Sequence, residues 1–131
     1  MPHIIVEYTD NLTREEFHPK TVLDKINKVF TDRPDVFPVG GVRSRAIRLT
    51  DYMIADGAGA DDAFVHVTVK IAPGRTQEQK DDACGELFDS LCDYLSPVYD
   101  QRGLALSLEL YEFGDGGTYK KNNIHKRYKQ Q

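Results

Sequence analysis

The stretch AFVHVTVKI at residues 63–71 alternates valine or isoleucine with other side chains, a pattern typical of a β-strand. Pro73-Gly74 turns the chain soon afterwards. Thr76 and Gln79 then have the spacing of a helix capping box. An apolar stripe follows at helical spacing, made by Cys84, Leu87, Phe88, Leu91 and Leu95. These residues predict a strand that leads through a tight turn into a helix.

A second strand completes this unit. Pro97 and Gly103 are expected to end the helix. Residues 104–113 then alternate, with leucine at 104, 106, 108 and 110. Residues 63–113 therefore predict one βαβ unit, and residues 114–131 form a carboxy-terminal tail.

The same order of elements is predicted for residues 2–50. Residues 2–8 alternate as a strand, and residues 42–49 form another. Between them, Thr13 and Glu16 have capping-box spacing, and Pro19 predicts that the main helix begins or kinks there. That helix is marked by apolar residues at helical spacing, namely Val22, Ile26 and Val29, with Leu23 and Phe30 beside them. The chain is thus two fused βαβ units, joined by the acidic loop of residues 56–62.

Two βαβ units predict an α+β fold, because parallel strands joined through a helix cross over right-handed. Both helices should lie on one face of a four-stranded sheet, within a single domain over residues 1–131. The strands carry apolar residues on both faces, such as Val6 against Ile5 and Val65 against Phe64. We therefore expect another copy of the chain to cover the second face of the sheet.

The composition fits a single compact domain. The 131 residues are 40% hydrophobic and 29% charged, with a formal net charge of −4. This charge argues against broad binding to nucleic acid or to an anionic membrane. No apolar run reaches the roughly 20 residues of a membrane helix, and no basic region precedes the first apolar run. We expect a cytoplasmic protein whose basic tail is solvated: Lys120, Lys121, Lys126, Arg127 and Lys129.

The chain has few side chains in known catalytic or metal-binding patterns. On one helix, Cys84 and Cys92 would lie about 12 Å apart, too far for a disulfide, so both are expected to be reduced. Its histidines are scattered without metal-ligand spacing, at positions 3, 18, 66 and 125. His66, in the middle of a strand, is interpreted as structural. We therefore expect no metal.

Pro2 is one of two features that remain. Methionine before proline is commonly removed, and Pro2 would then carry a free secondary amine at the start of a buried strand. Burial and nearby cations disfavour the charged form of such an amine and lower its pKa. A general base works best with a pKa near the operating pH. Proline at this position is common, however, so other support is needed.

The arginines are the second feature. Arg43 and Arg45 are two residues apart on a predicted strand and share a face, whereas Arg48 points the other way. Arg75 comes one residue before the Thr76 cap, where its charge adds to the positive end of the helix. The guanidinium group of arginine can donate two parallel hydrogen bonds to one carboxylate. The arginines thus indicate either a site for an anionic substrate or a set of ion pairs.

The motifs now permit a comparison with known families. PGRTQEQK at residues 73–80 resembles the Gly-Arg-[Ser/Thr]-x-Glu-Gln-Lys turn of the small 4-oxalocrotonate tautomerases, which have one βαβ unit per chain. The whole chain is similar to the longer, fused 5-carboxymethyl-2-hydroxymuconate isomerases of the same tautomerase superfamily. The similarity covers, in order, residues 2–7, 10–11, 41–45, 55–57, 63–71, 104–107 and the run Asn122-Asn123-x-His125.

The resemblance implies a tautomerase fold that assembles as a homotrimer. It implies that Pro2 is the catalytic base and that Arg43 and Arg75 bind substrate, with Arg45 as a further candidate. The implied reaction is a cofactor-free 1,3-allylic proton transfer between a dienol and an unsaturated ketone. Its substrate is an anionic carboxylate of bacterial homoprotocatechuate degradation, which starts from 4-hydroxyphenylacetate.

The two halves of the chain divide the candidate residues between them. In the short tautomerases the proline lies ten residues before the arginine. Ten residues before Arg75 is Val65, inside the chain, and ten after Pro2 is Leu12. One half therefore holds the base and the other the matching arginine. A working site needs both halves, either within one subunit or between subunits.

Two alternatives stay open. The first is another activity of the superfamily, such as phenylpyruvate-type tautomerisation, decarboxylation or hydrolytic dehalogenation. The second is a non-enzymatic trimeric binding protein, which retention of Met1 would favour. The sequence assigns no role to Asn122, Asn123 or His125.

Overall fold

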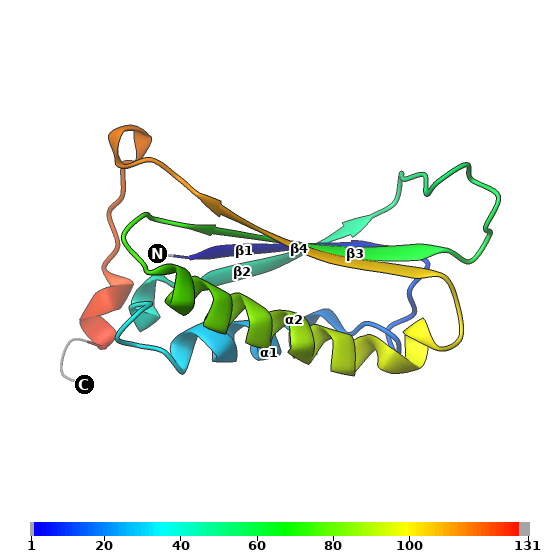
Figure 1. The fold of residues 1–131 in the computed structure, drawn as a ribbon, viewed down its shortest axis with the longest axis horizontal. Helices are drawn as coiled ribbons and strands as arrows, with labels where there is room; N and C mark the ends of the chain where they lie inside the picture. The colour runs from blue at the N-terminus through cyan, green and yellow to red at the C-terminus, as the bar shows by residue number, and fades with distance from the viewer. Residues whose placement is uncertain (1, 129–131) are drawn as a thin grey trace.

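A computed structural model describes residues 2–128 and shows one four-stranded sheet with both helices on the same face (Figure 1). The strands are β1 (His3–Thr9), β2 (Arg43–Leu49), β3 (Ala63–Ile71) and β4 (Leu104–Glu112). The helices are α1 (Pro19–Thr31) and α2 (Gln77–Tyr99), with 3-10 turns η1 (Val39–Gly41), η2 (Asp115–Gly117) and η3 (Ile124–Arg127). The predicted α+β fold of two βαβ units is confirmed.

The two βαβ units join through β1 and β3 in the middle of the sheet. The strand order is β2-β1-β3-β4. β1 is parallel to β2 and β3 is parallel to β4, whereas β1 and β3 are antiparallel. His3 therefore lies between Arg43 on one side and Lys70 on the other. This arrangement brings the start of the first unit to the same end of the sheet as the turn that carries Arg75.

The core lies between the sheet and the two helices. The sheet contributes alternate residues that are fully buried, including Ile4, Val6, Val65 and Val67. The helices contribute Val22 and Ile26 from α1, and Leu87, Leu91 and Leu95 from α2. Burial of each such side chain contributes about 1.5–3 kcal/mol. The predicted apolar stripes are therefore the faces that hold the layers together.

Helix α2 differs from its predicted form in two ways. It runs through Pro97 to Tyr99 rather than ending at the proline. Pro97 cannot donate to the carbonyl of Asp93, but Asp93 is exposed to water, and the extra turn buries Val98 in the core. Cys84 and Phe88 are only partly buried, whereas Ala83 is fully buried. The predicted stripe was therefore right for Leu87, Leu91 and Leu95, whereas Cys84 and Phe88 lie at its margin.

The capping boxes are both present, with different consequences. Thr76 and Gln79 exchange hydrogen bonds and begin α2, as predicted. Thr13 and Glu16 exchange the same bonds, at 2.9 and 3.2 Å, but they enclose an isolated turn. Helix α1 begins later, at Pro19, with His18 as its N-cap.

The cysteines are both free, as predicted, and burial raises the pKa of each thiol.

No helix within residues 2–128 is long and apolar enough to cross a membrane.

The open face of the sheet is more polar than the sequence pattern suggested. Its apolar residues, Ile5, Ile47 and Phe64, lie among charged or polar neighbours. Those neighbours are His3, Glu7, Arg43, Arg45, His66, Thr68 and Lys70. Ile47 is 44% exposed. A neighbouring copy on this face, which stays a prediction, would therefore make polar as well as apolar contacts.

Candidate functional site

Pro2 lies directly before β1, in the interior of the sheet. It is buried, and its carbonyl accepts a hydrogen bond of 3.1 Å from the Arg43 amide. β1 is flanked by β2 and β3, so strands on both sides hold this position. Met1 lies outside the described residues, and its removal stays a prediction.

Cationic groups surround the start of β1. Arg43 and Lys70 flank His3 on the two neighbouring strands, and Arg45 Nη1 lies 3.5 Å from His3 Nδ1. Burial lowers the pKa of His3, and the positive charges of Arg43, Arg45 and Lys70 lower it further. The start of β1 therefore disfavours added positive charge and favours an anion.

Arg43 and Arg45 lie on the same face of β2, as predicted, and both are exposed. Arg43 is level with His3, whereas Arg45 is one pleat farther along, level with Ile5. Of the two, Arg43 is thus nearer to Pro2, and Arg45 extends the cationic surface along the open face.

Arg75 reaches the same end of the sheet but is held by backbone carbonyls. Its Nε and Nη2 atoms donate to the Val36 carbonyl at 3.1 and 2.9 Å, and Nη1 donates to the Ala72 carbonyl at 3.2 Å. The guanidinium lies over the Phe37 ring, 5.0 Å from its centroid. These bonds leave one N–H on each of Nη1 and Nη2 for another acceptor. Arg75 can therefore brace the turn and bind an anion as well.

A segment that the sequence left without a role closes this end of the molecule. We call residues 118–128 the C-terminal strap; it follows η2 and passes the end of the sheet where Pro2 lies (Figure 1). Asn122 Nδ2 donates to the Gly40 carbonyl at 2.8 Å, and Asn122 Oδ1 accepts from the Ile124 amide at 2.8 Å. A Cβ atom added at Gly40 would meet the His125 backbone at 2.8 Å. The similarity over Asn122-Asn123-x-His125 was the only signal for this contact.

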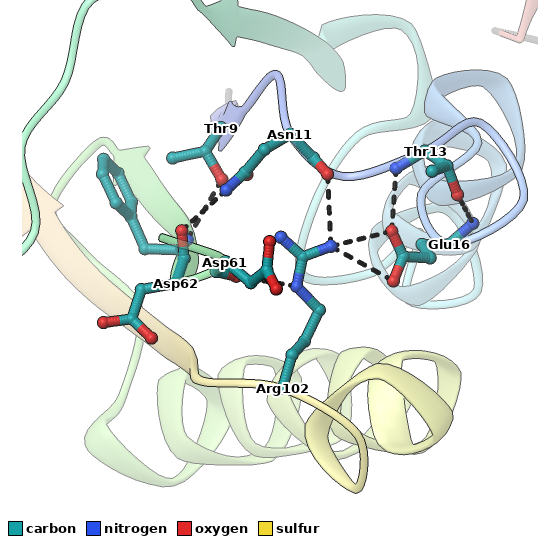
Figure 2. Close-up of polar contacts among 8 residues, drawn as sticks. Thr9, Asn11, Thr13, Glu16, Asp61, Asp62 and Arg102 are labelled. Carbon is teal, nitrogen blue, oxygen red and sulfur yellow. Dashed lines mark hydrogen bonds and ion pairs between the residues drawn. The ribbon is translucent and has the colours of Figure 1, made fainter. Parts of the chain in front are cut away.

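A second polar cluster lies at the opposite end of the sheet. Figure 2 shows the Arg102 side chain between Glu16 and the carbonyls of Asn11 and Asp61. Asn11 Nδ2 in turn donates to the Asp62 carbonyl at 2.7 Å. These bonds join three connecting segments, so the cluster fastens loops together far from Pro2.

His66 forms a hydrogen-bonded group on the open face. Its Nδ1 atom lies 2.7 Å from Ser107 Oγ, and its Nε2 atom lies 3.1 Å from Glu109 Oε1. Both ring nitrogens therefore have partners, as expected of a structural histidine. Within residues 2–128, no three His, Cys, Asp or Glu side chains are grouped so that they could hold a metal ion.

Comparisons with known proteins agree with the fold. The model of the 5-carboxymethyl-2-hydroxymuconate isomerase family matches residues 2–128. The chain is 36% identical over 129 residues to the 5-carboxymethyl-2-hydroxymuconate Delta-isomerase of Escherichia coli, which covers 98% of this chain and 100% of that protein.

Solved structures are similar over nearly the whole chain. A 5-carboxymethyl-2-hydroxymuconate isomerase from Deinococcus radiodurans superposes with a TM-score of 0.93 at 48% identity, covering 98% of this chain and 94% of that one. A symmetric trimer of fused 4-OT superposes with a TM-score of 0.66 at 16% identity, covering 91% and 93%. The second likeness is one of fold alone.

Proposed function

The chain belongs to the 5-carboxymethyl-2-hydroxymuconate isomerase family, and we propose from this premise that it isomerises 5-carboxymethyl-2-hydroxymuconate with Pro2 as the catalytic base. The reaction needs no net addition or loss of atoms, because one proton and one double bond move within the substrate. The observation that carries the assignment is the place of Pro2, buried at the start of β1 and bonded to the Arg43 amide.

The base is the secondary amine that removal of Met1 would expose. Its surroundings favour the uncharged form, since burial and neighbouring cations both lower the pKa of an amine. His3, the next residue, supports this expectation, because burial and then Arg43 lower its pKa. An amine that is neutral near physiological pH can accept a proton from the substrate.

Proton transfer then proceeds in two steps. Neutral Pro2 takes the proton from the 2-hydroxyl of the dienol, and negative charge develops on the 2-oxygen. Pro2 then returns a proton to carbon 5, which gives the unsaturated ketone and restores the neutral amine. In the reverse direction, Pro2 takes the proton from carbon. Guanidinium groups near the 2-oxygen stabilise its charge as it forms.

Arg43 and Arg75 hold the carboxylates of the substrate, with Arg45 as a further anionic contact. The antiparallel pairing of β1 and β3 supports this assignment, because it brings Pro2 and the Arg75 turn to one end of the sheet. Arg75 is already oriented by the Val36 carbonyl. Binding therefore costs less side-chain ordering than it would for a free arginine.

The working enzyme in this proposal is a cytoplasmic homotrimer in homoprotocatechuate degradation. The open sheet face supports the oligomer, since Ile5, Ile47 and Phe64 would be shielded there by a neighbouring copy. The trimeric fused 4-OT structure shares the fold. Light scattering of the purified protein tests the subunit number.

Intact mass and an ultraviolet assay test the function. We expect a mass that lacks Met1 and turnover of 5-carboxymethyl-2-hydroxymuconate. Pro2→Ala keeps a primary amine and should reduce turnover; Arg43→Ala and Arg75→Ala should raise KM, lower kcat, or both. Arg48→Ala is the control, because Arg48 lies on the other face of β2.

Several outcomes would overturn this assignment. Wild-type kinetics in all three variants would remove Pro2, Arg43 and Arg75 from the mechanism. A retained Met1 in fully active native protein would exclude the amine as base. Faster turnover of phenylpyruvate, a decarboxylation substrate or a haloacrylate would indicate another activity of the superfamily. Absence of any turnover, with ligand binding intact, would indicate a binding protein.

A further inference from the structure

We propose that Asn122, in the C-terminal strap, is a positioning residue for the isomerisation, which fixes where Pro2 stands relative to Arg75. The proposal rests on the proposed function and adds a residue to it. Asn122 acts through residues 36–43, which we call the connecting segment. This segment runs from the end of the first helical region through η1 to the start of β2.

The connecting segment is bonded to the candidate site at both of its ends. At one end, the Val36 carbonyl accepts hydrogen bonds from Nε and Nη2 of Arg75, at 3.1 and 2.9 Å. At the other end, the Arg43 amide donates to the Pro2 carbonyl at 3.1 Å. The path of this segment therefore helps to set the distance between the proposed base and the Arg75 guanidinium.

The middle of the connecting segment is the part that its own side chains constrain least. Phe37 is buried in the core, and Arg43 is paired with His3 in the sheet. Between them lie Gly40 and Gly41, which are buried but have no side chain to pack. Glycine has more backbone freedom than any other residue. Contacts from outside η1 therefore decide how this part of the segment is held.

The strap supplies these contacts through Asn122 and His125. Asn122 Nδ2 donates to the Gly40 carbonyl at 2.8 Å. The His125 backbone lies so close to Gly40 that a Cβ atom added there would be 2.8 Å from it. Asn122 Oδ1 accepts from the Ile124 amide at 2.8 Å, and this bond orients the side-chain amide toward Gly40. Asn122 thus ties the strap to the middle of the connecting segment.

Loss of this tie should misalign the substrate without removing a group that binds it. Arg43 and Arg75 would both remain to hold carboxylates, so KM should change little. A misplacement of about 1 Å can cost about a hundredfold in rate, so kcat should fall. This division between kcat and KM distinguishes Asn122 from a residue that binds the substrate directly.

Asn122→Ala tests the proposal in steady-state kinetics, at a temperature where the protein stays folded. We expect kcat for 5-carboxymethyl-2-hydroxymuconate to fall about tenfold or more, with little change in KM. The acid limb of the pH profile of kcat/KM should move to higher pH, because a less enclosed Pro2 amine has a higher pKa. A smaller folded fraction would lower kcat without moving this profile. An unchanged kcat, or a lower kcat with an unchanged profile, would overturn the proposal.

Two matched controls separate positioning from stability. Asn11 Nδ2 donates to the Asp62 carbonyl at 2.7 Å, so Asn11→Ala loses a bond of the same kind at the opposite end of the sheet. It should lower the free energy of unfolding but leave kcat and the pH profile unchanged. Asn123→Ala alters the exposed neighbour of Asn122 and should change none of these quantities. If Asn11→Ala lowered kcat as much as Asn122→Ala, the effect would be one of stability and the proposal would fail.

NMR without substrate separates this proposal from the proposed function. The resonances of the Arg75 Nε–H group and the Arg43 amide report on the two ends of the connecting segment. We expect both to shift in Asn122→Ala and neither to shift in Asn123→Ala. Such shifts in a protein that does not isomerise the dienol would show that the coupling stands and that the proposed function fails. Unshifted resonances in Asn122→Ala would overturn the positioning role whatever the enzyme assay shows.

Discussion

The Nη1 atom of Arg102 lies 3.0 Å from Glu16 Oε1 and 3.3 Å from Glu16 Oε2 (Figure 2). Both side chains are largely buried, with 14% of Arg102 and 24% of Glu16 exposed. The pair joins the turn after α2 to the turn before α1. A hydrogen bond from the Thr13 amide lowers the pKa of Glu16, and Arg102 lowers it further.

Glu16→Gln should therefore destabilise the protein by about 1.5–3 kcal/mol, the range for hydrogen bonds to charged groups. Because the native pKa of Glu16 is lowered, its contribution is complete above the ordinary glutamate pKa and is lost as the pH falls through the native value. The free energy of unfolding of the variant should therefore fall less than that of the wild type as the pH is lowered. Denaturant unfolding between pH 7 and pH 3 measures both effects.

Glu15→Gln is the control for this measurement, because Glu15 is the exposed neighbour of Glu16. It should change the free energy of unfolding by less than about 0.5 kcal/mol. An identical acid profile in wild type and Glu16→Gln would show that the pair contributes nothing measurable.

His3 reports the electrostatic field at the start of β1. Its pKa is lowered by burial and then by Arg43, so Arg43→Gln should raise it toward the ordinary histidine value. Arg48→Gln, on the other face of β2, should leave it unchanged. NMR titration of the His3 ring protons measures the shift. A His3 pKa that did not respond to Arg43→Gln would contradict the cationic environment proposed for Pro2.

The same shift has a consequence for stability. The native protein disfavours protonated His3, so the unfolded chain binds more protons between the lowered and the ordinary pKa. Stability should therefore rise with pH through this interval. Arg43→Gln should flatten that part of the pH profile.

Much of the fold could be predicted from sequence, because alternation and helical spacing report burial directly. The strand 63–71 and the helix that follows Thr76 have the bounds that their patterns indicated, apart from the end of the helix. The end of the helix was predicted wrongly at Pro97, because proline is a strong local signal for a helix end. The helix continues to Tyr99 because Val98 is buried in the core, which is a tertiary effect. Thr13 and Glu16 likewise formed their capping bonds around one turn only.

The candidate site was less predictable because its contacts join distant segments. Pro2 and the Arg75 turn lie at the same end of the sheet only because β1 and β3 pair antiparallel. A βαβ pattern in the sequence does not predict how the two units pair. The bond from Asn122 to Gly40 spans 82 residues. Arg75 was predicted to bind substrate, a role that is still a proposal, and its bonds to Val36 could not be foreseen.

Gly40 should be intolerant of any side chain. A Cβ atom there would lie 2.8 Å from the backbone nitrogen and Cα of His125, so the strap would have to move. We expect Gly40→Ala to cost about 1–3 kcal/mol, as for other overpacked sites. Gly85→Ala is the matched control, because Gly85 is an exposed residue within α2 and has nothing within 4 Å of an added Cβ.

Gly85→Ala should instead stabilise the protein by about 0.5–1 kcal/mol through helix propensity. Thermal unfolding of the two variants measures the difference in sign. If Gly40→Ala were as stable as wild type, the contact between the strap and η1 would be looser than its geometry indicates.

Arg75→Lys separates the two roles of Arg75. Lysine keeps the positive charge but cannot reproduce the fork that donates from Nε and Nη2 to the Val36 carbonyl. We expect the variant to lose about 1–2 kcal/mol of stability. We also expect kcat/KM to fall about tenfold or more, because the N–H groups of Nη1 and Nη2 that the turn leaves available for a substrate carboxylate are lost. Unfolding and steady-state kinetics, measured at a temperature where both proteins are folded, test the two effects independently.

Arg48→Lys controls for a change of arginine on the sheet. Reduced stability with unchanged kinetics would show that the guanidinium of Arg75 braces the turn and makes no two-pronged contact with the substrate.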